Sequence, residues 1–299
     1  MAIAKEHADA TVLALGESFG ATDEFAARFE AAATQEELPG GGLLPLQDKL
    51  LIAEYGHPGS PVLGVLGERD LDAAVQHVKD QALAYERLTD KTIVPTFELI
   101  TTVASESKGE DGEYSAETDP EELRPWVERA GEEGIYVVLD LQPGTDNFLD
   151  QAKQYEDLLK LPHVGLALDP EWKLLPGQRH LAQIGSVGAD EINATLDWLA
   201  QLTVDNGLPQ KVVVLHQFRH DMMPDRDQVD VSHDALALLV HVDGHGSPGD
   251  KMATWEALQE GLPDEMQLGW KNFIDEDKPM FTSEETVAIE PHPVFVSYQ

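Results

Sequence analysis

Short runs of apolar residues recur along the chain and alternate with longer stretches in which apolar residues follow a helical period. The runs are mostly continuous, with little strict alternation of apolar and polar positions, which is typical of strands buried on both faces of a parallel sheet. Eight runs predict strands, at residues 51–55, 92–99, 135–141, 164–169, 211–218, 235–242, 266–270 and 293–298.

The stretches between these runs predict helices. The strongest patterns cover residues 69–88, 119–134, 145–161 and 188–207, and weaker ones cover 224–230 and 251–261. The first of them has apolar residues at i, i+3 and i+4 spacing and acidic residues in its first turn. In the second, Asp119 is a candidate N-cap and Pro120 stands at the first helical position.

Strands that alternate with helices over about 250 residues predict an α/β protein with a single (β/α)8 TIM barrel. A doubly wound open sheet is the alternative, but the segment 55–64 after the first strand has no glycine-rich phosphate-binding pattern. Residues 1–45 predict a short N-terminal extension, with a helix at 23–35 followed by a Gly/Pro hinge. Residues 46–299 are expected to form the barrel domain.

Acidic residues stand at the predicted ends of several strands, and in TIM barrels the active site lies at the carboxyl ends of the strands. The candidate catalytic residues are Glu171, Asp140, Asp169 and Glu98. Asp140 and Asp169 end neighbouring strands, which lie about 4.8 Å apart. Carboxyl groups in that relation tend to have one raised and one low pKa, which suits a general acid paired with a base or nucleophile.

The other polar and aromatic residues at the strand ends are candidates for substrate binding. They are Glu54, Tyr55, His57, Gln142, Trp172, His216, Gln217, His241, Asp243, Trp270, Lys271 and Tyr298. The aromatic members suit a sugar, because flat rings stack on the C–H faces of pyranose and furanose rings. The expected partner is therefore a polysaccharide or oligosaccharide substrate.

The segment "LALDPEW", residues 166–172, resembles the catalytic strand of the glycosidase family that includes chitinases. The resemblance rests on a D-x-E pair at the end of a fourth barrel strand. It implies that Glu171 is the general acid and that Asp169 orients it. The longer D-x-x-D-x-D-x-E motif of that family is absent, since Leu166 and Leu168 stand in its place. A surface loop remains the alternative interpretation of this segment.

These residues predict a glycoside hydrolase-like enzyme with a two-carboxylate mechanism. Glu171 is the expected general acid and Asp140 the expected nucleophile or base. Glu98 is the alternative second carboxyl group, across the barrel. No metal and no cofactor are expected. Two alternatives remain open: a metal-dependent barrel hydrolase that uses His216, His241 and Asp243, and a non-catalytic glycan-binding barrel.

Charge and cysteine content narrow the possible partners. The chain has 20 Lys and Arg against 56 Asp and Glu, a net charge of −36, which disfavours nucleic acid and anionic membranes. No apolar run is long enough to predict a membrane span. The absence of cysteine excludes thiolate nucleophiles and cysteine-ligated metal sites. The oligomeric state is left open.

Several longer motifs, such as "YGHPGSPVLGVLGE", "LLKLPHVGLALDPEW" and "GWKNFIDED", resemble an uncharacterised group of secreted or lipoprotein-type proteins of actinobacteria. The resemblance extends over residues 38–299 and implies an extracellular or cell-envelope location. It supplies no reaction. Residues 1–20 do not have the pattern of a secretory signal. The expected substrate is therefore a cell-envelope or environmental polysaccharide.

Overall fold

Eight parallel strands form a closed barrel in the computed structural model, which describes residues 2–8, 11–13, 22–109 and 112–299. The strands are β1 (Lys49–Gly56), β2 (Thr92–Ala104), β4 (Tyr136–Leu141), β5 (Val164–Leu168), β6 (Lys211–Gln217), β7 (Leu236–Val242), β8 (Gln267–Asn272) and β9 (Phe295–Tyr298). Because β1 pairs with both β2 and β9, the sheet has no open ends. The predicted (β/α)8 TIM barrel is confirmed.

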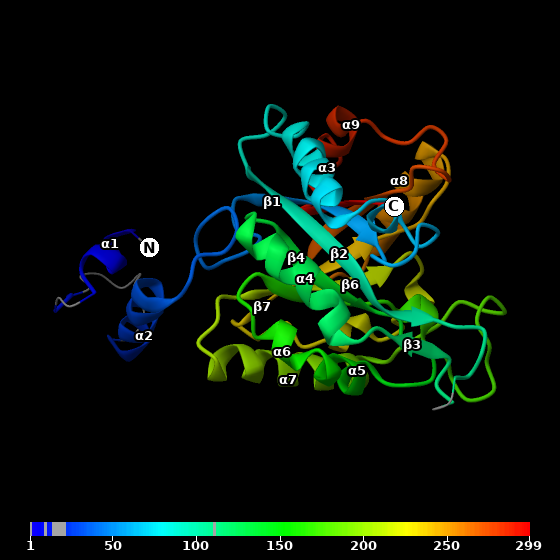
Figure 1. The fold of residues 1–299 in the computed structure, drawn as a ribbon, viewed down its shortest axis with the longest axis horizontal. Coiled ribbons are helices and arrows are strands. Elements are labelled where there is room, and N and C mark those ends of the chain that lie inside the picture. Colours follow the sequence, from blue (N-terminus) through cyan, green and yellow to red (C-terminus); the bar gives the residue numbers. More distant parts are fainter. Residues whose placement is uncertain (1, 9–10, 14–21, 110–111) are drawn as a thin grey trace.

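Helices surround the barrel, as Figure 1 shows. They are α3 (Leu71–Leu83), α4 (Pro120–Glu132), α5 (Phe148–Gln154), α6 (Glu156–Leu159), α7 (Ala189–Asp205), α8 (Pro248–Gln259) and α9 (Ser283–Val287). Two further helices, α1 (Ala2–Glu6) and α2 (Thr22–Thr34), lie apart from this ring in Figure 1. The segment after them leads into β1, which begins at Lys49.

Local sequence signals fix where individual helices begin. The Asp119 side chain accepts a hydrogen bond from the backbone N–H of Glu121, and Pro120 occupies the first turn of α4. This is the capping arrangement that the sequence predicts, and such a cap contributes about 1 kcal/mol. At α8, Ser247 and Asp250 form a reciprocal capping box.

One strand differs clearly from its predicted length. β2 continues to Ala104 and turns back as β3 (Ser115–Glu117), which pairs with it antiparallel. No apolar run in the sequence predicts this hairpin. Its base is fixed by Gln142, whose Oε1 accepts a hydrogen bond from the backbone N–H of Ala104 at 2.9 Å. The hairpin thereby extends the sheet beyond the carboxyl end of the barrel.

Alternate residues of each strand face opposite sides of the sheet, as pleated strands require. On β6, Val212 and Val214 belong to an apolar cluster inside the barrel, whereas Val213 and Leu215 pack against the outer helices. The inner cluster combines apolar strand residues that precede the inward polar groups with Leu38 and Leu46, which come before β1. The polar inward residues therefore come after it, at the carboxyl end of the barrel.

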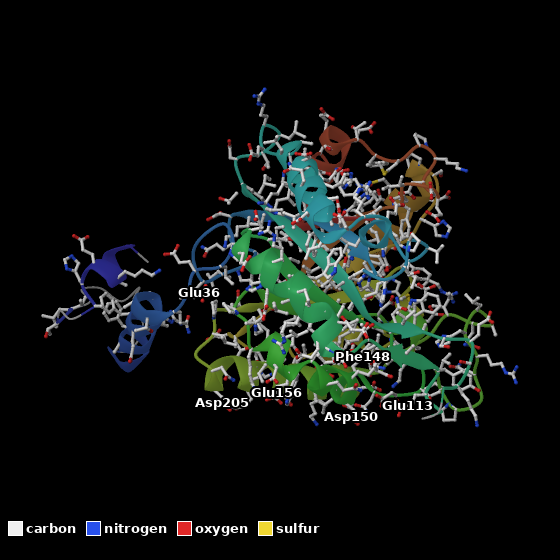
Figure 2. All side chains as sticks on the ribbon, viewed as in Figure 1. Glu36, Glu113, Phe148, Asp150, Glu156 and Asp205 are labelled. Atoms are coloured by element: carbon white, nitrogen blue, oxygen red, sulfur yellow. The ribbon has the colours of Figure 1, made fainter. Side chains whose placement is uncertain are left out.

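Acidic side chains are spread over the surface helices, for example Asp150 on α5, Glu156 on α6 and Asp205 at the end of α7 (Figure 2). They belong to different elements and do not form one tail. In the described part of the chain, no helix is long and apolar enough to cross a membrane.

Candidate active site

A cavity of about 650 Å³ lies at the carboxyl end of the barrel. Seven of the candidate residues line it: Tyr55, Gln142, Asp169, Glu171, Trp172, Asp243 and Lys271. They come from different strand ends around the barrel, so the parallel arrangement brings together residues that are far apart in the sequence. The volume is within the range of small-molecule sites, about 300–1,000 Å³.

Glu171 stands on a short 3-10 turn, Pro170–Trp172, that follows β5. The Asp169 side chain fixes this turn, because its Oδ1 accepts a hydrogen bond from the backbone N–H of Glu171 at 3.0 Å. Partial burial and the nearby negative charge of Asp243 raise the pKa of Glu171 to about 7. Burial and the neighbouring acids, Asp140 foremost, raise the pKa of Asp169 well above its usual value. Glu171 can therefore carry a proton at neutral pH, and burial favours the protonated form of Asp169 in the same way.

Asp243 faces the same cavity and is held from below by His216. The Asp243 Oδ2 and the His216 Nδ1 are 2.9 Å apart, with the imidazole N–H as donor. Burial alone raises the pKa of Asp243, but the hydrogen bond and positive charge of His216 outweigh it, so that the pKa is lowered. Asp243 Oδ1 has no hydrogen-bond partner among the described residues. The cavity thus presents an ionised carboxylate beside a protonated one.

Tyr55 and Lys271 form part of the cavity floor. The Tyr55 hydroxyl donates to Asp140 Oδ2 at 2.8 Å and accepts from Gln142 Nε2 at 3.2 Å. The Lys271 ammonium lies 3.7 Å from the centre of the Tyr55 ring. Because a cation covers this face, Tyr55 is not free to stack on a sugar there. Among the aromatic candidates, Trp172 remains as a cavity wall.

Four candidate residues form a fully buried polar layer beneath this floor: Glu98, Asp140, His216 and His241. None of them lines the cavity. His216 Nε2 is 2.9 Å from Glu98 Oε1 and 3.8 Å from Asp140 Oδ1. Burial and the charge of His216, which act in opposite directions, leave the pKa of Asp140 raised to about 6. The carboxyl groups of Asp140 and Glu98 therefore reach the cavity only through other side chains.

Four other candidates point away from the barrel interior: Glu54, Gln217, Trp270 and Tyr298. Gln217 accepts from the Arg226 guanidinium, and Trp270 packs on Trp255 with ring centres 5.6 Å apart. We expect from the sequence that each strand-end group faces the shared cavity, but the pleat sends alternate residues outward. These four side chains therefore do not reach the cavity.

Two of these outward residues lie near a second cavity, of about 850 Å³, between α3 and the segment that follows β8. Tyr298 lines it and hydrogen bonds to the hydroxyl of Tyr85. Glu54 pairs with His77, which also lines it. His57, the remaining candidate, lies 3.0 Å from the Thr118 hydroxyl and lines neither cavity. This second cavity lies outside the barrel and contains no pair of strand-end carboxyl groups.

Several residues that complete the site are not among the candidates expected from the sequence. Ser297 lies inside the barrel with its Oγ 3.1 Å from His241 Nε2. Phe273, Arg219 and Gln299 line the cavity. The two-residue period of the strands was the available signal, since Phe273 follows Lys271 by two positions and Ser297 precedes the outward-facing Tyr298.

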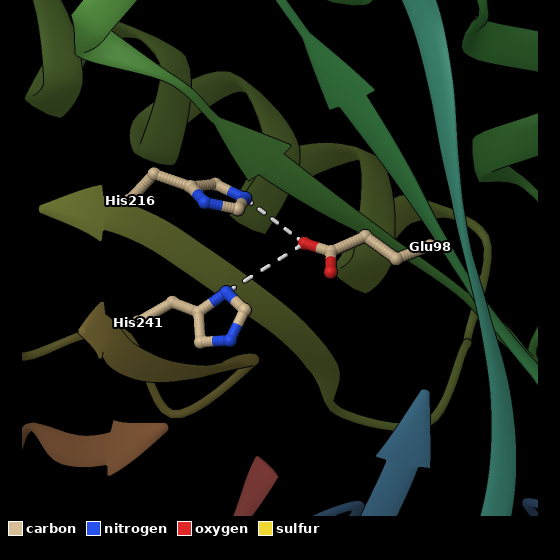
Figure 3. A group of neighbouring side chains, drawn as sticks. All are labelled: Glu98, His216 and His241. Carbon is tan, nitrogen blue, oxygen red and sulfur yellow. Dashed lines mark hydrogen bonds and ion pairs between the residues drawn. The ribbon is translucent and has the colours of Figure 1, made fainter. Parts of the chain in front are cut away.

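Two groups of side chains in the described residues have donor atoms close enough to hold a metal ion. One consists of Glu98, His216 and His241, in the buried layer (Figure 3). The other, Asp197 with Asp230 and His233, lies at the surface. The buried group differs from the ligand set considered from the sequence, because Asp243 bonds the other nitrogen of His216 and Glu98 takes its place.

Comparisons with known proteins assign no family to the chain. No family model matches the sequence, and no curated protein matches it significantly. Among solved structures, a xylanase and α-amylase inhibitor protein from Scadoxus multiflorus is 12% identical, with a TM-score of 0.46, over 83% of this chain and 92% of its own. A 7,8-dihydropteroate synthase from Vibrio fischeri is 11% identical, with a TM-score of 0.36, over 84% of this chain and 87% of its own.

A glycoside hydrolase family 6 enzyme from Coprinopsis cinerea, CcCel6C, is 14% identical, with a TM-score of 0.31, over 74% of this chain and 60% of its own. Structural neighbours thus include family 6 glycosidases and other barrels. At these identities and TM-scores the likenesses carry no argument about the fold or the reaction of this chain.

Proposed function

We propose that the protein is a hydrolase of the glycosidase type, acting on a neutral polysaccharide or oligosaccharide in the cavity at the carboxyl end of the barrel. One observation carries the proposal: Glu171, with a pKa of about 7, lines the same cavity as Asp243, whose carboxylate is held by His216. Two carboxyl groups with different protonation states in one site are the arrangement that an acid and a base require.

In this proposal Glu171 donates its proton to the glycosidic oxygen while the bond between that oxygen and the anomeric carbon breaks. A water molecule attacks the anomeric carbon, and its proton passes to Asp243. The step leaves Glu171 ionised and Asp243 protonated, and proton exchange with solvent restores both. A single displacement by water inverts the anomeric configuration, so inversion is the expected outcome.

Asp169 acts as a positioning residue in this scheme. Its Oδ1 holds the backbone N–H of Glu171, and it thereby fixes the turn that presents the acid to the cavity. The role matches the expectation from the "LALDPEW" resemblance. The base is assigned to Asp243 instead of Asp140, because Asp243 lines the cavity and Asp140 lies beneath its floor.

The charge of the cavity supports a neutral substrate. Asp169, Glu171 and Asp243 line it together with two basic residues, Lys271 and Arg219. With the chain's net charge of −36, this surrounding field repels polyanions. Trp172 offers an apolar wall for a sugar ring. We also propose an extracellular or cell-envelope setting, on the resemblance of the sequence to secreted proteins.

The test is the release of new reducing ends from a panel of neutral envelope and plant polysaccharides. Wild type, Glu171→Gln and Asp243→Asn are compared with Glu256→Gln, which removes an exposed carboxyl group from α8. We expect release by wild type and by the control, and a loss of about 10²–10⁴-fold in Glu171→Gln. Release that is unchanged in Glu171→Gln would remove this residue from the reaction. Binding without release in wild type would instead identify a non-catalytic glycan-binding barrel.

A further inference from the structure

We propose that the buried layer beneath the cavity is a binding site for one divalent transition-metal ion, with His216 Nε2, His241 Nδ1, Glu98 Oε1 and Asp140 Oδ1 as ligands. The donor atoms of Glu98, His216 and His241 all lie within 4.8 Å of one another (Figure 3). The proposal does not rest on the hydrolase function, because none of the four residues lines the cavity.

The distances between donor atoms suit a tetrahedral ion. With ligand bonds of 2.0–2.1 Å, neighbouring donors in a tetrahedral site lie about 3.4 Å apart. His216 Nε2 is 2.9 Å from Glu98 Oε1 and 3.8 Å from Asp140 Oδ1. His241 Nδ1 is 4.0 Å from Glu98 Oε1. These three distances each differ from the tetrahedral spacing by about half an ångström. Asp140 stands outside the group of three and must move further to become the fourth ligand.

Three of the proposed ligand residues have a buried polar atom without a hydrogen-bond partner among the described residues: His241 Nδ1, Asp140 Oδ1 and Glu98 Oε2. Buried groups of this kind are costly, and almost all of them have partners in folded proteins. All three side chains are fully buried. His241 Nδ1 and Asp140 Oδ1 are proposed ligand atoms, so a single ion bound there offers both of them a partner.

The second nitrogen of each imidazole is already occupied. His216 Nδ1 donates to Asp243, which leaves Nε2 to face Glu98. His241 Nε2 is 3.1 Å from the Ser297 hydroxyl, which leaves Nδ1 for an ion. Metal-binding histidines almost always have their other ring nitrogen held in this way, which fixes the tautomer and the ring orientation.

Asp140 is held in the same manner. Its Oδ2 accepts the Tyr55 hydroxyl at 2.8 Å, so that Oδ1 faces His216. Nitrogen ligands from histidine together with carboxylate oxygens favour zinc and similar divalent ions over calcium and magnesium, which prefer oxygen ligands.

The charge of the barrel interior also favours a cation. Four buried carboxyl groups, those of Glu98, Asp140, Asp169 and Asp243, face two cationic groups, Lys271 and His216. Because burial favours the protonated form of Asp169, the other three carboxyl groups, when ionised, exceed the two cations by one negative charge. A divalent ion that replaces the proton between His216 and Glu98, which is released to solvent, reduces this excess by one charge.

The experiment uses the full chain, treated with chelator and dialysed, and measures bound zinc by elemental analysis after adding zinc chloride. Cobalt(II) serves as a spectroscopic probe, since its visible spectrum reports tetrahedral coordination by nitrogen and oxygen. We expect about one ion per chain for wild type. His241→Gln and Glu98→Gln should lose the ion, with folding checked by circular dichroism.

Ser297→Ala keeps the proposal testable if a ligand variant does not fold. It removes only the group that orients His241, and we expect zinc affinity to fall about 10–100-fold. Two controls should bind zinc as wild type does: His163→Gln changes a half-buried histidine away from the cluster, and His233→Asn removes the surface cluster.

Three outcomes would overturn the proposal: no bound zinc in wild type, zinc retained in both ligand variants, or zinc lost in His233→Asn. Because bound metal is measured without substrate, failure here leaves the role of Glu171 untouched. Conversely, one bound zinc ion per chain in a protein that cleaves no glycan would support the metal site and contradict the proposed hydrolase function.

Discussion

Replacing Glu171 with glutamine is expected to stabilise the protein at alkaline pH. In the folded protein the pKa of this carboxyl group is raised from 4.5 to about 7, mainly by burial. Between these values the folded state binds more protons than the unfolded state, so stability falls as the pH rises. The stability contributed by the protonated form is fully present below about pH 4.5 and is lost as the pH passes through 7.

The size of the effect follows from the same shift. A change in pKa from 4.5 to about 7 corresponds to about 3 kcal/mol as an upper bound. Glu171 is partly open to the cavity, and solvent screening reduces this to about 1–2 kcal/mol. Glutamine keeps the shape of the side chain and cannot ionise. The variant should therefore melt about 2–4 °C above wild type at pH 8.

Thermal unfolding followed by fluorescence at pH 5 and pH 8 measures the difference. Glu256→Gln is the matched control and should differ from wild type by the same amount at both pH values. If Glu171→Gln also shows the same difference at pH 5 and pH 8, Glu171 ionises as an ordinary surface glutamate does. In that case it is not protonated at neutral pH, and the proposed general acid fails.

Three further predictions concern stability. Trp255→Ala removes a fully buried ring that packs on Trp270 and should lower the free energy of unfolding by about 3–5 kcal/mol in urea titrations; a loss below 1 kcal/mol would contradict the packing. Lys251→Met leaves the buried carboxylate of Asp277 without the cation 2.9 Å away, which should cost about 3–5 kcal/mol in the same titrations; a loss below about 1 kcal/mol would contradict this pairing. Asp119→Ala removes the cap of α4 and should cost about 1 kcal/mol, whereas Asp119→Asn should cost little.

The barrel could be predicted from the sequence because its strands are continuous apolar runs separated by capped helices. The boundaries of α4 and of β6 follow closely from Asp119, Pro120 and the run that begins at Lys211. The β2–β3 hairpin could not be predicted in this way. Its second strand, Ser115–Glu117, is three residues long and has no apolar pattern, and it is fixed by contacts with Gln142 that are distant in sequence.

The sequence predicts which residues stand at the strand ends, but it does not predict which side of the sheet each side chain faces. The sequence shows that Trp270, Lys271 and Asn272 stand at the end of one strand, but the facing of each side chain depends on the register of the pleat. Lys271 faces inward, whereas Trp270 and Asn272 hydrogen bond to one another outside the barrel. A strict two-residue period applied from the inward apolar positions would have separated these sets.

The sequence also could not show how deep in the barrel each candidate residue lies. Asp140 and Asp243 both follow apolar runs, yet one lies beneath the cavity floor and the other lines it. The difference arises because Asp243 lies just beyond β7 (Leu236–Val242), whereas Asp140 lies within β4 (Tyr136–Leu141) and is covered by Tyr55. Only the three-dimensional arrangement of neighbouring strands shows this.

The most direct test of the central claim compares two substrates of one sugar in the variant Glu171→Gln. A natural oligosaccharide needs a proton on its leaving oxygen, whereas a dinitrophenyl glycoside leaves as a stable phenolate without one. We predict that Glu171→Gln loses about 10²–10⁴-fold in kcat/KM on the oligosaccharide and little on the dinitrophenyl glycoside, and that Asp243→Asn loses activity on both. Equal losses of Glu171→Gln on the two substrates would contradict the assignment of Glu171 as the general acid.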